Sequence, residues 1–530
     1  MSDQDSPQDK LADEREYLKE LESKPFLERS FTYIKKTGPG LMQSAMTLGA
    51  GSAAASVVAG ASFGYKLLWV QPVAMFFGVM MFAAIANTVL SNKERPYWGF
   101  MRESWKIFPP LVLLIFFWAF GSIMASVFWH FPQYGLAAGA ARTIVNEFAP
   151  DLKLEVREPV LKPDGEPELD SLGKPKTKHV SYTGAGYGVS FATGLLILII
   201  NTTVVFNYGR GGIGIKIYEW FLRCMIGMVF LTFFMVVAIN FNNIQWLEMG
   251  KGFIGWYGIP MGNNTIENAK TITMVLGMLG AAVGINMTFM YPYSLQKKGW
   301  GAEHKTLAKW DLGMTMFLPF VVVTSLIMIG MTVSGIYDME NTRNLKDVVL
   351  SDINPLMAAT ALQSSFISER AAIIIFCGGL FGMTFGAISA HMTCCGFVVC
   401  EMFGLKQTTT KFRIFALTPS IGIFGVVFSL PLWFPIATSA VCLTMLPIAY
   451  LIFLVMNNRR SYIGEAVGKG AKRWIFNCLL VLALILVSIG ATVSFKKTVI
   501  DGVRKAVAEQ APAASTATES IDETDVPVAE

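Results

Sequence analysis

Charged residues are scarce in this chain. Only 15% of its 530 residues are Asp, Glu, Lys or Arg, whereas 53% are hydrophobic and the mean hydropathy is +0.48. Soluble globular domains carry about 25% charged residues. The shortage of charge therefore excludes a soluble globular protein and predicts an all-α polytopic membrane protein.

Cysteine is also scarce, and the seven Cys residues lie in apolar segments without an extracellular pairing pattern. We interpret them as small buried hydrophobic residues. Cys394, Cys395 and Cys400 lie close together, but their spacing fits no zinc motif. We therefore predict no metal site among the cysteines.

The usual signatures of catalysis and of ATP use are missing. The sequence contains no Walker A motif, no recognisable catalytic triad and no Rossmann fingerprint. Residues 1–30 are highly charged and lack the apolar core of a signal peptide. We expect neither an enzyme nor an ATP-driven pump, and we predict no cofactor and no nucleic-acid partner.

Long apolar segments recur along the chain and predict about eleven transmembrane helices. They fall near 40–62, 67–90, 108–130, 184–207, 214–240, 268–296, 312–336, 370–402, 413–434, 436–456 and 474–495. The predicted organisation is an N-terminal cytosolic segment (1–37), a first repeat of helices 1–5 (38–240) with an extracytoplasmic insert (131–183), a second repeat of helices 6–10 (241–457), helix 11 with its preceding loop (458–495) and a disordered tail (496–530).

Lys and Arg are concentrated in every second loop between the predicted helices. One set of loops is basic, for example at Lys93 and Arg95 and at Arg459 and Arg460, whereas the opposite set holds few cations. Because basic loops stay on the cytosolic side, we predict a cytosolic N-terminus and, with eleven spans, an extracytoplasmic C-terminus. The predicted location is the plasma (inner) membrane.

The first and sixth predicted helices each contain a weak point. Gly49, Gly51 and Ser52 lie within the first, and Gly284 and Asn286 lie within the sixth. A Gly costs about 0.8–1 kcal/mol relative to Ala inside a helix. Two weakened helices five spans apart predict a 5+5 inverted repeat with a binding site at the membrane midplane. The alternative is that the small residues only let neighbouring helices pack closely.

Several motifs resemble the NRAMP (natural resistance-associated macrophage protein) metal-ion transporters. Gly38-Pro39-Gly40 and the run from Ala59 to Val70 are similar to that family's first helix, Gly280-Ala281-Ala282-Val283 to the start of its sixth-helix motif, and Glu401-Met402-Phe403-Gly404 to the end of its helix eight. The similarity spans roughly residues 30–495. It implies a LeuT-like fold with broken helices 1 and 6, and secondary transport of a divalent metal ion by alternating access.

The departures from the family pattern fall on its metal site. Where the family has Asp-Pro-Gly-Asn, this chain has Gly49-Ala50-Gly51-Ser52, and where the family has Met-Pro-His, it has Gly284-Ile285-Asn286. The ligand side chains of the family's site, its thioether among them, are absent from these positions. Because thioether ligands favour transition metals and no anion offsets dehydration, we do not expect Mn²⁺ or Fe²⁺ to be held as in the family. No metal ligands are predicted.

The residues expected to line the substrate site are those of the two weak points, mostly through backbone carbonyls: Gly49, Ala50, Gly51, Ser52, Val283, Gly284 and Asn286. Three interpretations stay open. The site could hold a hydrated cation such as Mg²⁺, which dehydrates reluctantly, or a small non-metal solute whose carboxylate meets half-helix N-termini. The third is a receptor or sensor that binds without transport. The partners are therefore the lipid bilayer and a small ion or solute; the oligomeric state stays open, and a monomer would suffice.

Ionisable residues within spans are costly and usually face a cavity or a partner. The resemblance implies a proton route along helix three, where His130 and Gln133 stand closest to the positions of the family's carboxylates. We therefore predict these two as a candidate proton route, with a satisfied structural histidine as the alternative. His391 is interpreted as structural. Glu219 and Glu401, near cytosolic helix ends, are expected to pair with loop Lys or Arg.

Overall fold

The computed structural model describes residues 13, 16–18, 20–21, 23–92, 94–159, 161, 165–167, 177–208, 212–261, 265–333, 368–407, 409–427 and 433–496. The predicted disordered tail, 496–530, lies outside the described residues except for Lys496.

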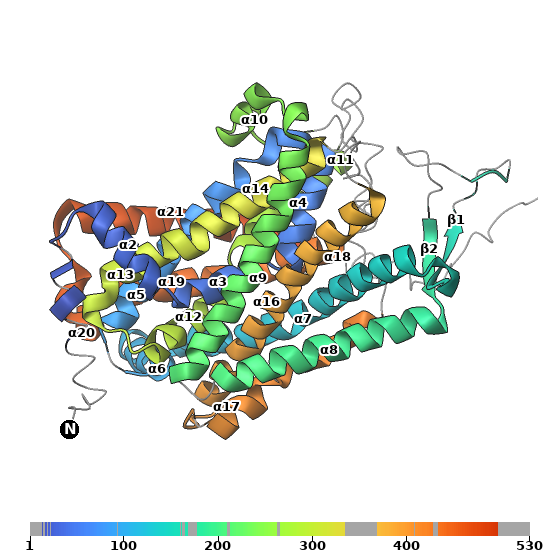
Figure 1. Ribbon diagram of the computed structural model, residues 1–530. Coiled ribbons are helices and arrows are strands. Elements are labelled where there is room, and N and C mark those ends of the chain that lie inside the picture. The colour runs from blue at the N-terminus through green and yellow to red at the C-terminus, as the bar shows by residue number, and fades with distance from the viewer. Residues whose placement is uncertain are drawn as a thin grey trace, which may run out of the picture.

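Long apolar helices form a bundle (Figure 1). Within the described ranges, eight helices are long and apolar enough to cross a membrane, or up to ten if each of two bent pairs is one span. The bent pairs are Pro39–Thr47 with Ala50–Leu67 and Val441–Asn457 with Arg460–Val467, and Thr271–Lys297 counts as one of the eight. Such a helix needs about 20 apolar residues to cross about 30 Å of hydrocarbon. The prediction of an all-α polytopic membrane protein is confirmed.

The spanning elements follow the predicted order. The first half contains α3 (Pro39–Thr47), α4 (Ala50–Phe63), α5 (Val70–Leu90), α7 (Val112–Phe148), α8 (Gly184–Tyr208) and α9 (Gly212–Ile239). The second half contains α11 (Thr265–Ala282), α12 (Ile285–Lys297), α13 (Lys305–Asp311), α14 (Leu318–Val333), α16 (Glu369–Met402), α18 (Trp433–Leu443), α19 (Leu446–Asn457) and α21 (Gly470–Phe495). Shorter helices outside these are α2 (Phe26–Lys36), α6 (Pro96–Ile107), α10 (Trp246–Phe253), α17 (Thr409–Ala416) and α20 (Arg460–Ile463).

Both helices that were predicted to be interrupted are broken. Leu48 and Gly49 separate α3 from α4, and the two helices differ in direction by 51°. Val283 and Gly284 separate α11 from α12. In each gap the glycine leaves the helical region for extended backbone, with φ −120° at Gly49 and φ −106° at Gly284. The chain thus has a pair of broken helices at equivalent places in its two halves.

The third span is longer than predicted. α7 runs on to Phe148, whereas the predicted span ended at 130. At about 1.5 Å per residue such a helix is about 55 Å long, which exceeds the roughly 30 Å of hydrocarbon. The predicted insert, 131–183, therefore begins as a continuation of this helix. His130 and Gln133 lie in its middle and not at a helix end.

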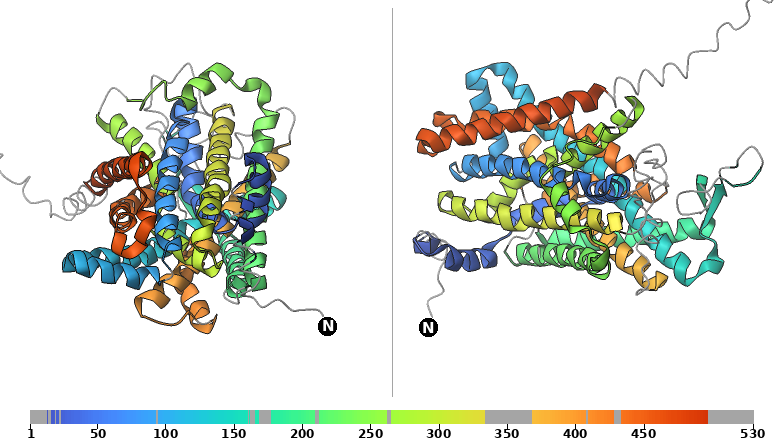
Figure 2. Two further views of the ribbon diagram at one scale, coloured as in Figure 1. Left: turned by 90° about the vertical axis from the view of Figure 1, so that its left-hand side faces the viewer. Right: turned by 90° about the horizontal axis from the view of Figure 1, so that it is seen from above.

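The rest of the insert contains a small hairpin in which β1 (Glu155–Pro159) pairs antiparallel with β2 (Thr177–Tyr182). Arg142 of α7 attaches this hairpin to the bundle. Its guanidinium donates to the Tyr182 hydroxyl at 2.8 Å and to Ser190 Oγ of α8 at 2.5 Å, and it pairs with Glu155 at 3.3 Å. The hairpin and α2 lie at opposite ends of the bundle (Figures 1 and 2).

The predicted ninth span, 413–434, differs most from expectation. It consists of the end of α17 and the 3₁₀ helix η7 (Thr418–Val426), and residues 428–432 lie outside the described residues. η7 packs directly on the backbone of α7. A Cβ at Gly422 would lie 2.2 Å from His130 Cβ, and one at Gly425 would lie 2.2 Å from the Phe131 carbonyl oxygen. Glycine at both positions permits this close contact.

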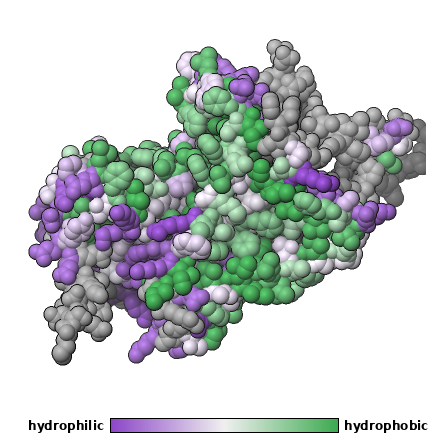
Figure 3. Space-filling model, viewed as in Figure 1, coloured by the Kyte–Doolittle hydropathy of each residue, from purple (hydrophilic) through white to green (hydrophobic). Residues whose placement is uncertain are grey.

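On the face seen in Figure 3, apolar residues cover the middle of the bundle, and hydrophilic ones gather at the end that holds α2 and α20. The two acidic residues expected to pair with basic loops do so. Glu401 accepts from the Arg95 guanidinium at 2.8–3.0 Å, and Glu219 pairs with Lys298. These pairs connect separate segments of the chain at helix ends.

Close helix packing at Gly60 can be tested by substitution. A Cβ there would lie 2.4 Å from the Met328 carbonyl oxygen of α14, so Gly60→Ala should force α4 and α14 apart and cost about 1–3 kcal/mol. The measurement is the thermal unfolding midpoint in detergent. Gly227→Ala is the matched control, because a Cβ at Gly227 meets no heavy atom within 4 Å. Equal midpoints for the two variants would refute the close contact.

Candidate functional site

At the first break, a side chain from another helix caps the second half-helix. An α-helix leaves its first N–H groups without intrahelical partners, and at membrane depth water does not replace them. The Ala50 N–H donates to Gln133 Oε1 of α7 at 2.9 Å, and the Ser52 hydroxyl donates to the Gly49 carbonyl at 3.1 Å. Gly49 leaves room for this cap, since a Cβ there would lie 2.7 Å from Gln133 Nε2.

At the second break, the helix caps itself with its own side chains. The Gly284 N–H donates to the Met287 thioether at 3.2 Å, and the Met287 N–H donates to Asn286 Oδ1 at 3.1 Å. The N–H groups of Gly284 and Met287, at the start of α12, therefore have acceptors from the same turn.

Asn286 connects three helices at this point. Its side-chain amide donates to Ser126 Oγ of α7 at 3.2 Å and to His391 Nδ1 of α16 at 2.9 Å. The backbone carbonyl oxygen of Asn286 accepts from the Cys394 thiol at 3.3 Å. Because the amide nitrogen donates, His391 Nδ1 is an acceptor in this arrangement and its Nε2 carries the proton.

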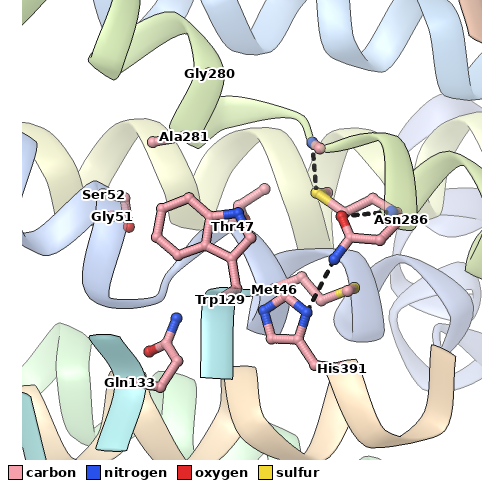
Figure 4. Close-up of a pocket in the computed structure, with 12 residues that line it drawn as sticks. Met46, Thr47, Gly51, Ser52, Trp129, Gln133, Gly280, Ala281, Asn286 and His391 are labelled. Atoms are coloured by element: carbon pink, nitrogen blue, oxygen red, sulfur yellow. Dashed lines mark hydrogen bonds between the residues drawn. The ribbon is translucent and has the colours of Figure 1, made fainter. Parts of the chain in front are cut away.

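A small cavity lies between the two breaks (Figure 4). Its volume is about 20 Å³, which is room for about one water molecule. All of its lining residues are uncharged at neutral pH apart from the titratable His391. They are Met46, Thr47, Gly51, Ser52, Trp129, Gln133, Gly280, Ala281, Gly284, Asn286, Met287 and His391.

Part of the predicted site lies at this cavity. Gly51, Ser52, Gly284 and Asn286 line it, and so does Gln133 from the candidate proton route. The other predicted lining residues, Gly49, Ala50 and Val283, do not. They lie in or beside the breaks but face other contacts, as Ala50 does through Gln133.

The expected contribution of backbone carbonyls stays a prediction, and the helix ends beside the cavity bear on it. Ala50, Gly51 and Ser52 form the first turn of α4, and a first turn presents N–H groups. The last carbonyls of a helix are the ones without intrahelical partners. The residues at such helix ends that border this cavity are Met46 and Thr47 of α3 and Gly280 and Ala281 of α11.

Three side chains with sulfur or imidazole donors line the cavity without having been predicted there. Met46 and Met287 were not considered from the sequence, and His391 was interpreted as structural. The motif comparison considered only the positions aligned with the family's ligands. Met287 directly follows the predicted site residue Asn286, and His391 is a polar residue in the middle of an apolar helix. These two features are the weak indications in the sequence that both residues belong to the site. Their meeting depends on how α3, α12 and α16 pack.

His130 lies behind the cavity and does not line it. Its ring Nδ1 lies 2.9 Å from the Ser126 carbonyl, to which it donates, and its buried Nε2 has no hydrogen-bond partner among the described residues. The ring centroid is 5.5 Å from that of His391 and 6.0 Å from that of Tyr134. Trp129, one residue earlier, does reach the cavity, where a Cβ at Gly51 would lie 2.4 Å from its ring.

A buried carboxylate holds the start of the first half-helix. Asp311 of α13 accepts from the backbone N–H of Gly40 at 2.7 Å and of Gly38 at 3.3 Å, and from the Thr315 hydroxyl at 3.0 Å. These are the orphan donors at the N-terminus of α3. In the part of the chain that the structure describes, no group of three or more His, Cys, Asp or Glu residues is placed to hold a metal ion.

Solved structures of a manganese transporter from Eremococcus coleocola share this fold. A mutant of it matches with a TM-score of 0.61 and 14% identity, over 91% of this chain and 89% of that chain. Its complex with an aromatic bis-isothiourea substituted compound matches with a TM-score of 0.60 and 14% identity, over 92% and 91%. At this identity the likeness concerns the fold, and it confirms the predicted LeuT-like arrangement.

No curated protein matches the chain in sequence. The sequence model of one family, described as natural resistance-associated macrophage protein-like, matches residues 183–494. This is more than half of the chain and includes the second broken helix, α16 and its His391. The chain therefore belongs to the NRAMP family, and it is a membrane transporter and not an enzyme.

Proposed function

We propose that the protein is a secondary transporter that carries a small cation by alternating access, with the cavity between the two breaks as its substrate site. One observation carries this proposal. The C-terminal turns of α3 and α11 both border the cavity, and each helix C-terminus presents about half a negative charge. The opposing N–H groups of Ala50, Gly284 and Met287 already donate to protein acceptors. Because these three N–H groups are occupied, the helix starts oppose the carbonyl ends less strongly, and we infer that the cavity favours positive charge.

The size of the cavity also favours a small cation as the substrate. With room for about one water molecule, it accommodates a dehydrated ion, whereas a small organic solute or a Mg²⁺ that keeps several waters requires a wider cavity than the one present. The organic solute and the hydrated Mg²⁺ are alternatives for another conformation of the transport cycle. A receptor that binds without transport is the alternative to a transporter. The loss of the family's motif ligands still argues against Mn²⁺ or Fe²⁺ held as in the family.

Filling the cavity should stop transport. In Gly51→Ala the new Cβ would lie 2.4 Å from the Trp129 ring and 2.9 Å from Ser439 Oγ, so the variant should reduce cation uptake into proteoliposomes at least tenfold. Uptake of monovalent and divalent cations is measured in parallel, with Gly227→Ala as the control of unchanged uptake. If well-folded wild-type protein takes up no cation, or if Gly51→Ala transports normally, the proposed function is wrong.

We further propose that His130 carries the coupling proton. Its free Nε2 is buried, and the titratable groups facing it are His391, which lines the cavity, and Tyr134. On the other side it packs against Gly422 of the uncharged η7. Gln133, the second residue of the predicted route, acts as the cap of α4 and lies one helical turn beyond.

His130→Gln should separate transport from the proton gradient. Gln keeps a hydrogen-bonding group but does not titrate near neutral pH, so uptake should no longer rise when the outside is acidified. Cation binding, measured at equilibrium, should change by less than about twofold because the residue does not line the cavity. An unchanged response to the gradient would exclude His130 as the proton carrier.

The proposed orientation places α2 in the cytosol and the β1–β2 hairpin outside the cell, in the plasma (inner) membrane. The two lie at opposite ends of the bundle (Figure 2), and the loops at the α2 end are the basic ones. The C-terminal tail would then be extracytoplasmic.

Thiol labelling of intact cells tests this orientation. In a background with Cys224 and Cys478 replaced by Ser, a membrane-impermeant maleimide should label the exposed site of Glu166→Cys but not that of Glu28→Cys. After the membranes are opened, both should react. The reverse labelling pattern would invert the topology.

A further inference from the structure

Soft electron donors surround the cavity. Met46 from α3 and Met287 from α12 bring thioethers, and His391 from α16 brings an imidazole. All three are buried, with at most 7% of each residue exposed. Thioether sulfur binds soft cations such as Cu⁺ in preference to Mg²⁺, Ca²⁺ or Mn²⁺, and imidazole is compatible with the same ions.

The lining also contains no carboxylate. The cost of moving an ion out of water rises steeply with its charge, and a buried ion needs charged or strongly polar partners. A divalent ion would meet only helix-end carbonyls and neutral side chains here. A monovalent soft ion has a much smaller dehydration cost, and two thioethers and an imidazole can replace its water.

We propose that the cavity is a binding site for a soft monovalent cation of the Cu⁺ type, held by Met46, Met287 and His391. The proposal rests on the cavity being the substrate site of the proposed transporter, and it specifies the chemical class of the substrate. The Met287 sulfur already accepts the Gly284 N–H at 3.2 Å, and its second lone pair is available to the ion.

Asn286 acts as a positioning residue for the imidazole. In the ion-free arrangement its amide nitrogen donates to His391 Nδ1 at 2.9 Å, so the ring proton is on Nε2. When Nε2 binds the ion, that proton leaves to water and Nδ1 gains one, so the imidazole stays neutral. The amide then turns so that its oxygen accepts the Nδ1 proton, the arrangement in which a neighbouring carbonyl orients a histidine ligand. The Met287 N–H gives up its bond to this oxygen and keeps the Gly284 carbonyl as its acceptor.

The test is equilibrium binding to the full-length protein in detergent. Cu⁺ is presented under ascorbate with bicinchoninate as the competing chelator, and Ag⁺ serves as a redox-stable probe. Cys224 and Cys478, which are not buried, are replaced by Ser in every sample. We expect one site per protein, with no displacement by Mg²⁺ or Mn²⁺ in large excess.

Matched variants assign the site. Met287→Leu and His391→Gln should each weaken Cu⁺ and Ag⁺ binding at least tenfold, and Met46→Leu should weaken it in the same direction. Met314→Leu, an exposed methionine outside the cavity, and Cys394→Ser should bind as the parent does. Thermal unfolding verifies folding of each variant, and Leu for Met conserves volume.

A carboxylate placed beside the site supplies an independent gain-of-function readout. Asn286→Asp should let Mn²⁺ compete with Ag⁺, because the added anion offsets the dehydration of a divalent ion.

Three results would each overturn the assignment of the site. They are loss of ion binding in Cys394→Ser, unchanged ion affinity in Met287→Leu and His391→Gln, and competition by Mn²⁺ in the parent protein. If Mg²⁺ is transported in a manner sensitive to Gly51→Ala while Ag⁺ does not bind, the substrate class fails and the proposed function stands. If no cation binds or is taken up, both fail.

Discussion

The main constraint on this protein is that two helices end inside the membrane, where water cannot satisfy their backbone groups. Such breaks persist only when protein groups take over the hydrogen bonds or a polar cavity is present. Here Gln133 satisfies the start of α4, and the Met287 thioether and the Asn286 amide satisfy the start of α12. Side chains thus occupy some of the N–H groups at these two N-termini, and the C-terminal turns of α3 and α11 border the same cavity.

The unbroken helices α7 and α16 form the frame around these breaks. α7 supplies Ser126, Trp129 and Gln133 along one face, and α16 supplies His391 and Cys394. η7 packs on the α7 backbone at Gly422 and Gly425 without intervening side chains. This close contact holds α7 in place, and with it the side chains that α7 brings to the two breaks.

The start of α3 is held differently from its end. Asp311 fastens the backbone at Gly38 and Gly40, and a Cβ at Gly38 would touch Glu219, which pairs with Lys298. Charged side chains thus hold the start of the first half-helix, α3, whereas its end lies at the break before α4. Hydrogen bonds to charged groups contribute about 1.5–3 kcal/mol each, so release of α3 would require the Asp311 contacts to open.

The family relationship and the altered ligand motifs describe two separate properties. The fold depends on apolar faces, small residues at close contacts and the positions of the breaks, and these tolerate 14% identity to the manganese transporter structures. In the proposed transporter, selectivity would depend on a few side chains at the cavity, and those can be replaced by residues from other turns or other helices. The donors that surround this cavity come from α3, α12 and α16.

The sequence by itself determined the membrane-spanning character, the order of the helices and the two breaks, because apolar length and glycine placement are local properties. It also placed Asn286 and Gln133 near the site. It did not predict the full length of α7, the 3₁₀ form of η7, the cap that Gln133 provides or the role of Asp311. It also missed the meeting of Met46, Met287 and His391, because only the packing of three helices brings them together. The local sequence indicates where a helix can be interrupted. Which side chains form hydrogen bonds to the backbone groups at the interruption depends on contacts between residues far apart in the chain.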